Sequence, residues 1–269
     1  MLESTLNYLA AMPERPYYYL VDPPPDVPVR NTKGDRRTLP IHDARALAPT
    51  PTLDREGFAL VHHTTAVQDL YDPATVRSAY YAEMETLVAK ATGATRVQAF
   101  DHNVRCRTLA ERRERGAQDP VRLVHNDYTE RSGPDRVRDL MGDDAEALLR
   151  HRCAVINVWK PIRGPVEEAP LAFCDAQSMQ LDDFIPSDLR YGDRTGEIYS
   201  LRFRPTHRWY YYPDMQADEA LLLKCFDSAT DRARFTAHTA FDDPNSADDA
   251  APRESIEVRT MAFFPPAAT

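Results

Sequence analysis

The sequence predicts a mainly β protein with flanking α-helices, built around a β-barrel core. From about residue 95 onward the chain carries short apolar or alternating runs, separated by turn-forming or charged residues, a pattern typical of strands. Regular helices do not alternate with these runs, which favours a barrel or sandwich over a parallel sheet. The runs are VQAFDH, RLVHNDYT, CAVINVWKPI, LAFCDAQSM, EIYSLRF, HRWYYYPDM, ALLLKCFDS and SIEVRTMAFF.

The start of the chain has a different character. Residues 1–52 are rich in proline and charge, as in VDPPPDVPVRNTKGDRRTLP. Because proline lacks an N–H group and fixes φ, we expect an N-terminal arm of extended segments and turns packed on the body. The runs YYYL at 17–20 and FALVHH at 58–63 are apolar enough to be edge strands. No linker divides the remainder, so residues 53–269 are predicted to form a single domain.

Two segments predict helices outside the barrel. In residues 73–91 apolar side chains recur at helical spacing, Pro73 suits a first helical turn, and Gly93 can end the helix. Residues 135–151 carry a second apolar stripe at the same spacing. We therefore expect both helices to pack their apolar faces onto the strands.

Charge and cysteine usage narrow the class of protein. The formal net charge of -9 argues against a nucleic-acid partner, whose phosphates require lysine and arginine. No apolar run reaches the ~18 residues that a membrane span needs, so no membrane partner is expected. The four cysteines form no C-x-x-C pair and lie in or beside apolar runs, as buried free thiols do. Free thiols indicate a reducing compartment, and we expect a cytoplasmic protein.

The segment RLVHNDYT carries the most informative pair of residues. Side chains at positions i and i+2 of a strand point to the same face, so His125 and Asp127 should project together. An imidazole and a carboxylate on one face supply two ligands of a 2-His-1-carboxylate site, which leaves metal positions open for co-substrate and oxygen. A hydrogen-bonded histidine near a turn is the competing interpretation of the pair.

A third ligand has to come from a late strand that faces the first. His207 opens HRWYYYPDM after an apolar run and has that position, although a surface histidine beside Arg208 is the alternative. His238, in FTAHTAFDDP, is interpreted as a surface-loop residue, and a place behind the metal ligands is the alternative. The sequence thus predicts a metal site, with catalytic ligands His125, Asp127 and His207.

If the co-substrate of this metal site is 2-oxoglutarate, the protein also needs a cation that binds its distal carboxylate. Lys224 lies in the run LLLKCF, where burial is costly unless an anion pairs with the ammonium. Ser228, on the same strand, could add a hydrogen bond. Arg253 and Arg259 on the last strand are alternatives, because a guanidinium offers a bidentate fork. The cofactor-binding candidates are therefore Lys224, Arg259, Arg253 and Ser228.

Several motifs together resemble a known family. HNDYT, INVWKPI, LAFCDAQS, HRWYYYPDM with DEALLLKCFDS, and HTAFDDP with RESIEVRTMAF stand in the order found in the hydroxylase/desaturase family. That family includes fungal gibberellin-desaturase-like proteins, the cephamycin methoxylation protein and a meroterpenoid endoperoxide-forming enzyme. The similarity covers about residues 53–264.

The resemblance implies a double-stranded β-helix (jelly-roll) fold, with Fe(II), 2-oxoglutarate and O2 as cofactor and co-substrates. It implies a dioxygenase that functionalises C–H bonds by hydroxylation, desaturation or cyclisation. The substrate expected from it is a small secondary metabolite or an amino-acid-derived compound. The family's metal motif maps onto His125, Asp127 and His207.

Other interpretations stay open at this point. A 2-oxoglutarate-independent iron oxygenase or oxidase could use the same fold and metal. A non-catalytic jelly-roll binding module would have structural histidines, and zinc hydrolysis would use the same ligand types but lacks an evident general base. The aromatic residues Tyr17, Tyr18 and Tyr19 could form a homodimer contact or a lid over the site.

Overall fold

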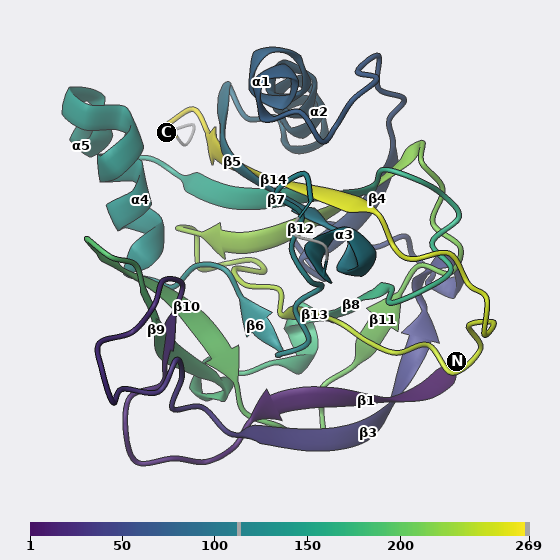
Figure 1. Cartoon of the computed structure of the whole chain (residues 1–269). Helices are drawn as coiled ribbons and strands as arrows, with labels where there is room; N and C mark the ends of the chain where they lie inside the picture. Colours follow the sequence, from purple (N-terminus) through teal and green to yellow (C-terminus); the bar gives the residue numbers. More distant parts are fainter. Residues whose placement is uncertain (112–113, 267–269) are drawn as a thin grey trace.

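The computed structural model describes residues 1–111 and 114–266, and two β-sheets form its framework (Figure 1). The nine-stranded sheet has the order β1-β3-β11-β8-β13-β6-β10-β9-β2, and the five-stranded sheet has the order β4-β12-β7-β14-β5. Neighbouring strands are antiparallel except for the pairs β3–β11 and β2–β9. The strands are β1 (Leu2–Leu9), β2 (Tyr17–Tyr19), β3 (Gly34–Asp43), β4 (Phe58–His62), β5 (Arg96–Arg105), β6 (His125–Asn126), β7 (Cys153–Pro161), β8 (Leu171–Cys174), β9 (Phe184–Arg190), β10 (Thr195–Leu201), β11 (Trp209–Tyr211), β12 (Glu219–Asp227), β13 (His238–Ala240) and β14 (Ser255–Phe263).

The main core lies between the two sheets. Strands β7 and β12 are buried along their whole length, and their side chains alternate between the two faces of the five-stranded sheet. Val155, Trp159 and Leu223 point inward and pack against Leu201, Trp209 and other residues of the nine-stranded sheet. This arrangement confirms the predicted mainly β fold, a double-stranded β-helix (jelly-roll).

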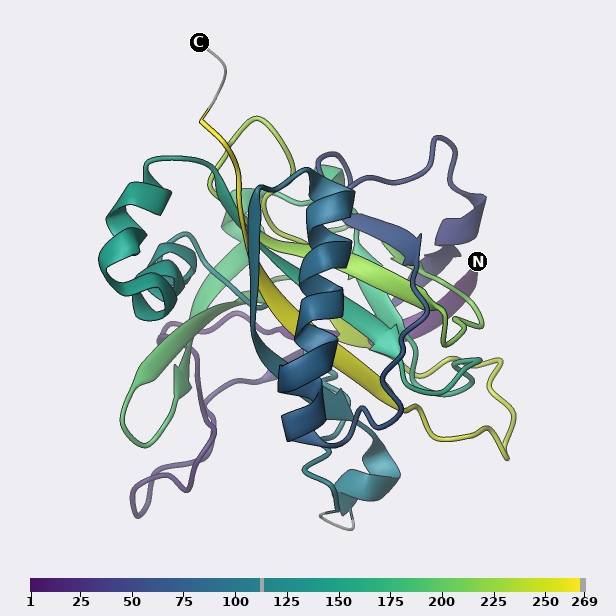
Figure 2. The same cartoon turned by 90° about the horizontal axis from the view of Figure 1, so that it is seen from above.

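The outer face of the five-stranded sheet is covered by a helix (Figure 2). Its parts follow one another without a break: α1 (Pro73–Thr75), a π-helical turn (Val76–Tyr80) and α2 (Tyr81–Thr92). Asp72 caps the first turn, and Gly93, at φ 73°, ends the last one. The helix predicted at 73–91 is therefore confirmed, and its apolar face packs on the outward side chains of the sheet.

The other helices are short. The second predicted helix is present as α4 (Ser132–Met141) and α5 (Ala145–Leu149), joined by a 3-10 turn at Gly142–Asp144. Helix α3 (Arg107–Glu111) follows β5. Further 3-10 turns occur at Ala44–Ala46, Ala176–Ser178 and Leu181–Asp183.

The proline-rich start contributes more regular structure than the expected extended segments and turns. Strands β1 and β3 pair over eight residue positions and form one side of the nine-stranded sheet. Leu2, Leu6 and Tyr8 of β1 are buried in the core between the sheets. Strands β2 and β4 lie at sheet edges, as their sequences predict.

The cysteines agree with the prediction of buried free thiols. All four cysteines are free and buried, so they pack as small apolar side chains. None of the helices in the described part of the chain has the length and apolarity that a membrane span requires.

Candidate functional site

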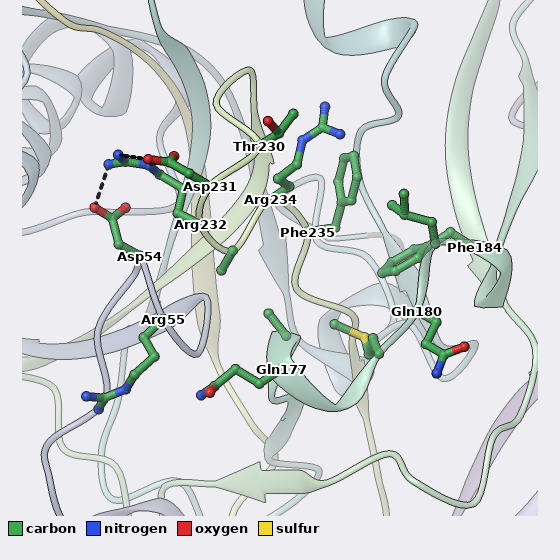
Figure 3. A pocket seen from close by; sticks show the side chains of 14 residues that line it. Asp54, Arg55, Gln177, Gln180, Phe184, Thr230, Asp231, Arg232, Arg234 and Phe235 are labelled. Atoms are coloured by element: carbon green, nitrogen blue, oxygen red, sulfur yellow. Dashed lines mark hydrogen bonds and ion pairs between the residues drawn. The ribbon is translucent and has the colours of Figure 1, made fainter. Parts of the chain in front are cut away.

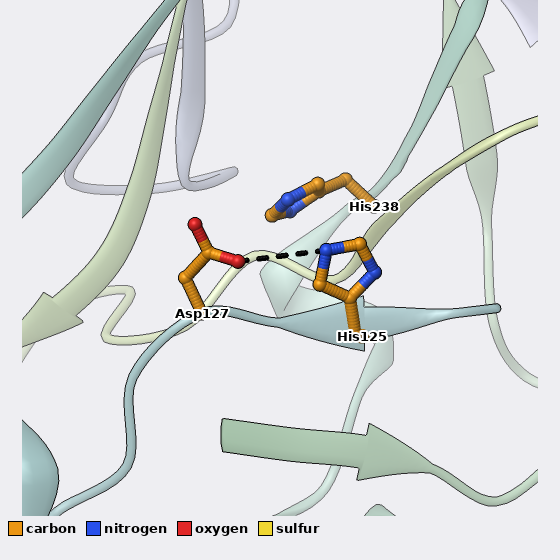
Figure 4. A group of neighbouring side chains, drawn as sticks. All are labelled: His125, Asp127 and His238. Carbon is orange, nitrogen blue, oxygen red and sulfur yellow. Dashed lines mark ion pairs between the residues drawn. The ribbon is translucent and has the colours of Figure 1, made fainter. Parts of the chain in front are cut away.

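Three metal-binding side chains meet inside the fold: His125, Asp127 and His238 (Figure 4). Strand β13 pairs with β6 so that His238 stands opposite His125, and their ring centroids are 4.5 Å apart. Asp127 follows β6, and its Oδ1 lies 3.5 Å from Nε2 of His125. One candidate ligand atom from each residue lies within 4.8 Å of the others, a spacing that a single metal ion can bridge.

Hydrogen bonds to the backbone fix both imidazole rings. Nδ1 of His125 donates to the carbonyl of Leu123 at 2.7 Å, and Nδ1 of His238 donates to the carbonyl of Thr236 at 3.0 Å. A carbonyl only accepts, so the proton resides on Nδ1 and Nε2 keeps its lone pair. Burial, together with the neighbouring His125, lowers the pKa of His238, so that its ring is neutral, the form that binds a metal.

The carboxylate of Asp127 is equally constrained. Its Oδ2 accepts hydrogen bonds from Nδ2 of Asn157 and Nε of Arg259, both at 2.8 Å. Burial opposes the charged form, but the positive charge of Arg259 outweighs it and holds the pKa of Asp127 well below its usual range. Asp127 is thus an anion with one oxygen occupied and the other facing His125.

The structure does not bring His207 to this cluster, which corrects its assignment as the third ligand. His207 precedes β11, and its side chain is fully buried, with Nε2 3.0 Å from Oδ2 of Asp183 and Nδ1 3.1 Å from the hydroxyl of Tyr8. Both ring nitrogens are therefore occupied by protein partners. His238 takes the predicted place of His207, and it is 2% exposed instead of lying on the surface.

Lys224 is also engaged elsewhere. It is buried as expected, but its anionic partners are protein carboxylates: Nζ donates to Asp54 and, at 2.8 Å, to Asp227. Asp227 binds Arg152 as well, at 2.7 Å. Ser228 accepts a hydrogen bond from the backbone N–H of Cys153. Because Lys224 is paired with two carboxylates, its ammonium is not free to bind a co-substrate.

Replacing Lys224 with methionine is expected to destabilise the protein. Removing one member of a buried ion pair leaves the other uncompensated, which costs about 3–5 kcal/mol; the remaining bond from Arg152 to Asp227 places this variant near the lower value. Denaturant unfolding measures the change. An unchanged free energy of unfolding would contradict the structural assignment.

Arg259 and Arg253 have different environments. Arg259 pairs with Asp127, Asp101 and Glu257, so each of its three guanidinium nitrogens has a carboxylate partner. Arg253 is 4% exposed and donates through Nη1 to the carbonyl of Ala169, but within the described ranges it has no carboxylate partner. Burial and the positive charges of Arg105 and Arg122 lower the pKa of Arg253 to about 9, which still leaves it charged at neutral pH.

Unpartnered polar atoms accompany Arg253 and Asp127. Among the described residues, Nε of Arg253, Oγ of Ser255 and Oδ1 of Asn157 are buried without a hydrogen-bond partner. Ser255 is the first residue of β14, and Arg253 stands two residues before it, so the two form an R-x-S pair. In the sheet, β14 neighbours β7, which carries Asn157. Buried polar groups are normally paired, so the donors Nε of Arg253 and Oγ of Ser255 indicate a place for an anionic, hydrogen-bonding ligand. The R-x-S spacing at the start of β14 is the sequence signal for Ser255 that was missed.

A surface pocket of about 530 Å³ lies apart from the cluster (Figure 3). Residues 230–235, on the segment that leads to His238, form one wall, and Phe184 and Asp54 lie in the lining. The three arginines in this pocket, Arg55, Arg232 and Arg234, each pair with a carboxylate. The pocket therefore offers no free cation, and the cluster between the sheets is the better candidate for chemistry.

Sequence comparisons place the chain beside fungal oxygenases. A family model described as "Oxidoreductase/YMDC permease-like domain" matches residues 6–263. The chain is 34% identical to the Fe(II)/2-oxoglutarate-dependent dioxygenase nvfI of Aspergillus novofumigatus, over 91% of this chain and 90% of that protein. It is 32% identical to the hydroxylase/desaturase CTB9 of Cercospora beticola, over 94% of this chain and 89% of that protein.

A solved structure agrees with these relatives. The fold matches that of the iron and alpha-ketoglutarate-dependent endoperoxidase NvfI with a TM-score of 0.89 and 31% sequence identity, over 98% of both chains. A similarity of this extent includes the strands that carry the cluster and the helix over the outer sheet. The metal-binding side chains described above thus lie in the same fold as an iron enzyme.

Proposed function

We propose that His125, Asp127 and His238 hold an Fe(II) ion. The chain belongs to the family of Fe(II)/2-oxoglutarate-dependent dioxygenases and hydroxylase/desaturases, whose members require this metal. The observation that carries this proposal is the convergence of Nε2 of His125 and one ligand atom each from Asp127 and His238 within 4.8 Å. Two neutral imidazoles and one carboxylate are the donors that non-haem Fe(II) takes in this class of enzyme.

We further propose that Arg253 and Ser255 hold the distal carboxylate of 2-oxoglutarate. The co-substrate would supply the anion that the buried guanidinium of Arg253 lacks, and the carboxylate could accept hydrogen bonds from Nε of Arg253 and Oγ of Ser255. Trp159 supports this role, because the guanidinium lies over its ring at 5.6 Å from the centroid and is fixed in place. Arg259 is not proposed as the anchor, since Asp127, Asp101 and Glu257 already use it.

The reaction class follows from the cofactors. When bound, Fe(II) with 2-oxoglutarate and O2 supplies the oxidising power that removes hydrogen from a substrate carbon. The chain's own part is to keep metal positions open, to orient the co-substrate and to exclude water with the apolar side chains between the sheets. We propose oxidative C–H functionalisation of a small secondary metabolite or amino-acid-derived compound, by hydroxylation, desaturation or cyclisation.

The proposal is tested on purified, metal-stripped protein under anaerobic conditions. Addition of Fe(II) and then 2-oxoglutarate is expected to produce the weak visible charge-transfer band of a chelated keto acid. Admission of O2 is then expected to yield succinate. Iron binding without the band would favour a 2-oxoglutarate-independent oxygenase on the same fold, and no iron binding would favour a non-catalytic binding module.

Location and assembly belong to the proposal as well. Four buried free thiols support a reducing compartment, and we propose the cytoplasm. Tyr18 on the edge strand β2 is 40% exposed, with Leu20 and Val21 exposed beside it, and this edge is where a homodimer would form.

A further inference from the structure

The two sheets contribute different parts of the metal site. His125 and His238 lie on strands of the nine-stranded sheet, and Asp127 follows one of those strands. The two donors that hold Asp127 come from the opposite sheet, Asn157 from β7 and Arg259 from β14. These two residues stand in register on adjacent antiparallel strands. The carboxylate of Asp127 is therefore hydrogen-bonded by the five-stranded sheet, which itself supplies no candidate metal ligand.

Both of these hydrogen bonds go to the same oxygen of Asp127. Oδ2 of Asp127 accepts from both donors at 2.8 Å, whereas Oδ1 is the oxygen nearest to His125. Oδ2 is thereby less available to a metal, and the carboxylate presents a single oxygen to the cluster. Asn157 is fully buried and cannot turn away to solvent.

Arg259 is itself held in a fixed orientation. Its Nη1 contacts Asp101 at 3.0 Å and its Nη2 contacts Glu257 at 3.2 Å, while Nε reaches Asp127. A guanidinium bound on three sides has little freedom, so its position determines that of Asp127. A lysine could supply the charge but not three directed contacts.

We propose that Arg259 and Asn157 are positioning residues that keep Asp127 a one-oxygen ligand and set the affinity of the site for divalent metal. This inference rests on the proposed metal function of His125, Asp127 and His238. Without Arg259, Oδ2 of Asp127 would lose its charged donor, and Asn157 alone would restrain the carboxylate. Groups that orient metal ligands typically change metal affinity by about 10–100-fold when they are removed.

The test uses Mn(II) as the probe and needs neither substrate nor turnover. Free Mn(II) has an electron paramagnetic resonance signal that broadens when the ion binds, so the Kd is read from the free ion. Arg259→Gln is expected to raise the Kd for Mn(II) by about 10–100-fold, and Arg259→Lys by less. Asn157→Ala removes one donor and leaves the ion pair, so it is expected to fall between the parent and Arg259→Gln.

Arg152→Gln is the matched control, because it breaks another partly buried arginine–aspartate pair without a contact to the cluster. It is expected to lower the melting temperature and leave the Kd for Mn(II) unchanged. A Kd for folded Arg259→Gln and Asn157→Ala within about threefold of the parent value would overturn the inference, since removed orienting groups cost at least about tenfold. A parent protein that binds no Mn(II) would instead overturn the proposed function.

Discussion

Replacing His238 with alanine is expected to remove Fe(II) binding under conditions that saturate the parent protein. In the proposed site His238 supplies one of three protein ligands, and its ring lies 4.5 Å from that of His125, on the strand that pairs with β6. Loss of groups that merely orient a ligand costs about 10–100-fold in metal affinity, so loss of the ligand should exceed about 100-fold. Anaerobic Fe(II) titration measures the change, and the 2-oxoglutarate band should disappear with the iron.

His207→Gln is the matched control for this experiment. Both ring nitrogens of His207 are occupied by Tyr8 and Asp183, so the substitution should lower the free energy of unfolding. Because His207 does not belong to the cluster, the Kd for Fe(II) should stay within about threefold of the parent value. The opposite result, with Fe(II) binding lost in His207→Gln and kept in His238→Ala, would restore His207 as the ligand.

The ligand pair His125 and Asp127 could be predicted because strand geometry is local. Residues two apart on a strand share a face whatever the rest of the chain does. The third ligand depends on which later strand pairs with β6, a long-range feature with no local signal. β13 has only three residues, and its sequence resembles a loop. The run after His207 has a clearer strand pattern than the run around His238, which favoured His207 as the ligand. In the structure, Asp183 and Tyr8 lie close enough to bond both of its ring nitrogens.

Lys224 is buried and paired with an anion, as its sequence context requires, but in the structure the anions are Asp54 and Asp227. A buried ammonium does require an anion, and Asp227, three residues later on the same strand, provides it. Asp54 approaches from a segment 170 positions away, which no local pattern reveals. The start of the chain was underestimated for a similar reason: proline content suggested an arm, whereas the alternating burial of β1 places Leu6 and Tyr8 in the core.

Replacing Arg253 with glutamine is expected to weaken 2-oxoglutarate binding while leaving Fe(II) binding intact. Arg253 is buried and lacks a carboxylate partner in the described structure, and its Nε is unsatisfied, so the bound co-substrate would complete its charge and hydrogen bonds. Removing one partner of a buried, hydrogen-bonded charge pair costs about 2–5 kcal/mol, which corresponds to a Kd about 30- to 5,000-fold higher. Ser255→Ala removes a single hydroxyl and should cost about 1.5–3 kcal/mol.

Titration of the charge-transfer band with 2-oxoglutarate in the Fe(II)-loaded protein gives both affinities. Lys224→Met is the control, because Lys224 is the rival anchor and is already paired with Asp227. If Arg253 anchors the co-substrate, the half-saturating concentration rises in Arg253→Gln and stays at the parent value in folded Lys224→Met. A rise in Lys224→Met with none in Arg253→Gln would mean that the interior ion pairs rearrange on binding and that the buried charge of Arg253 serves the fold alone.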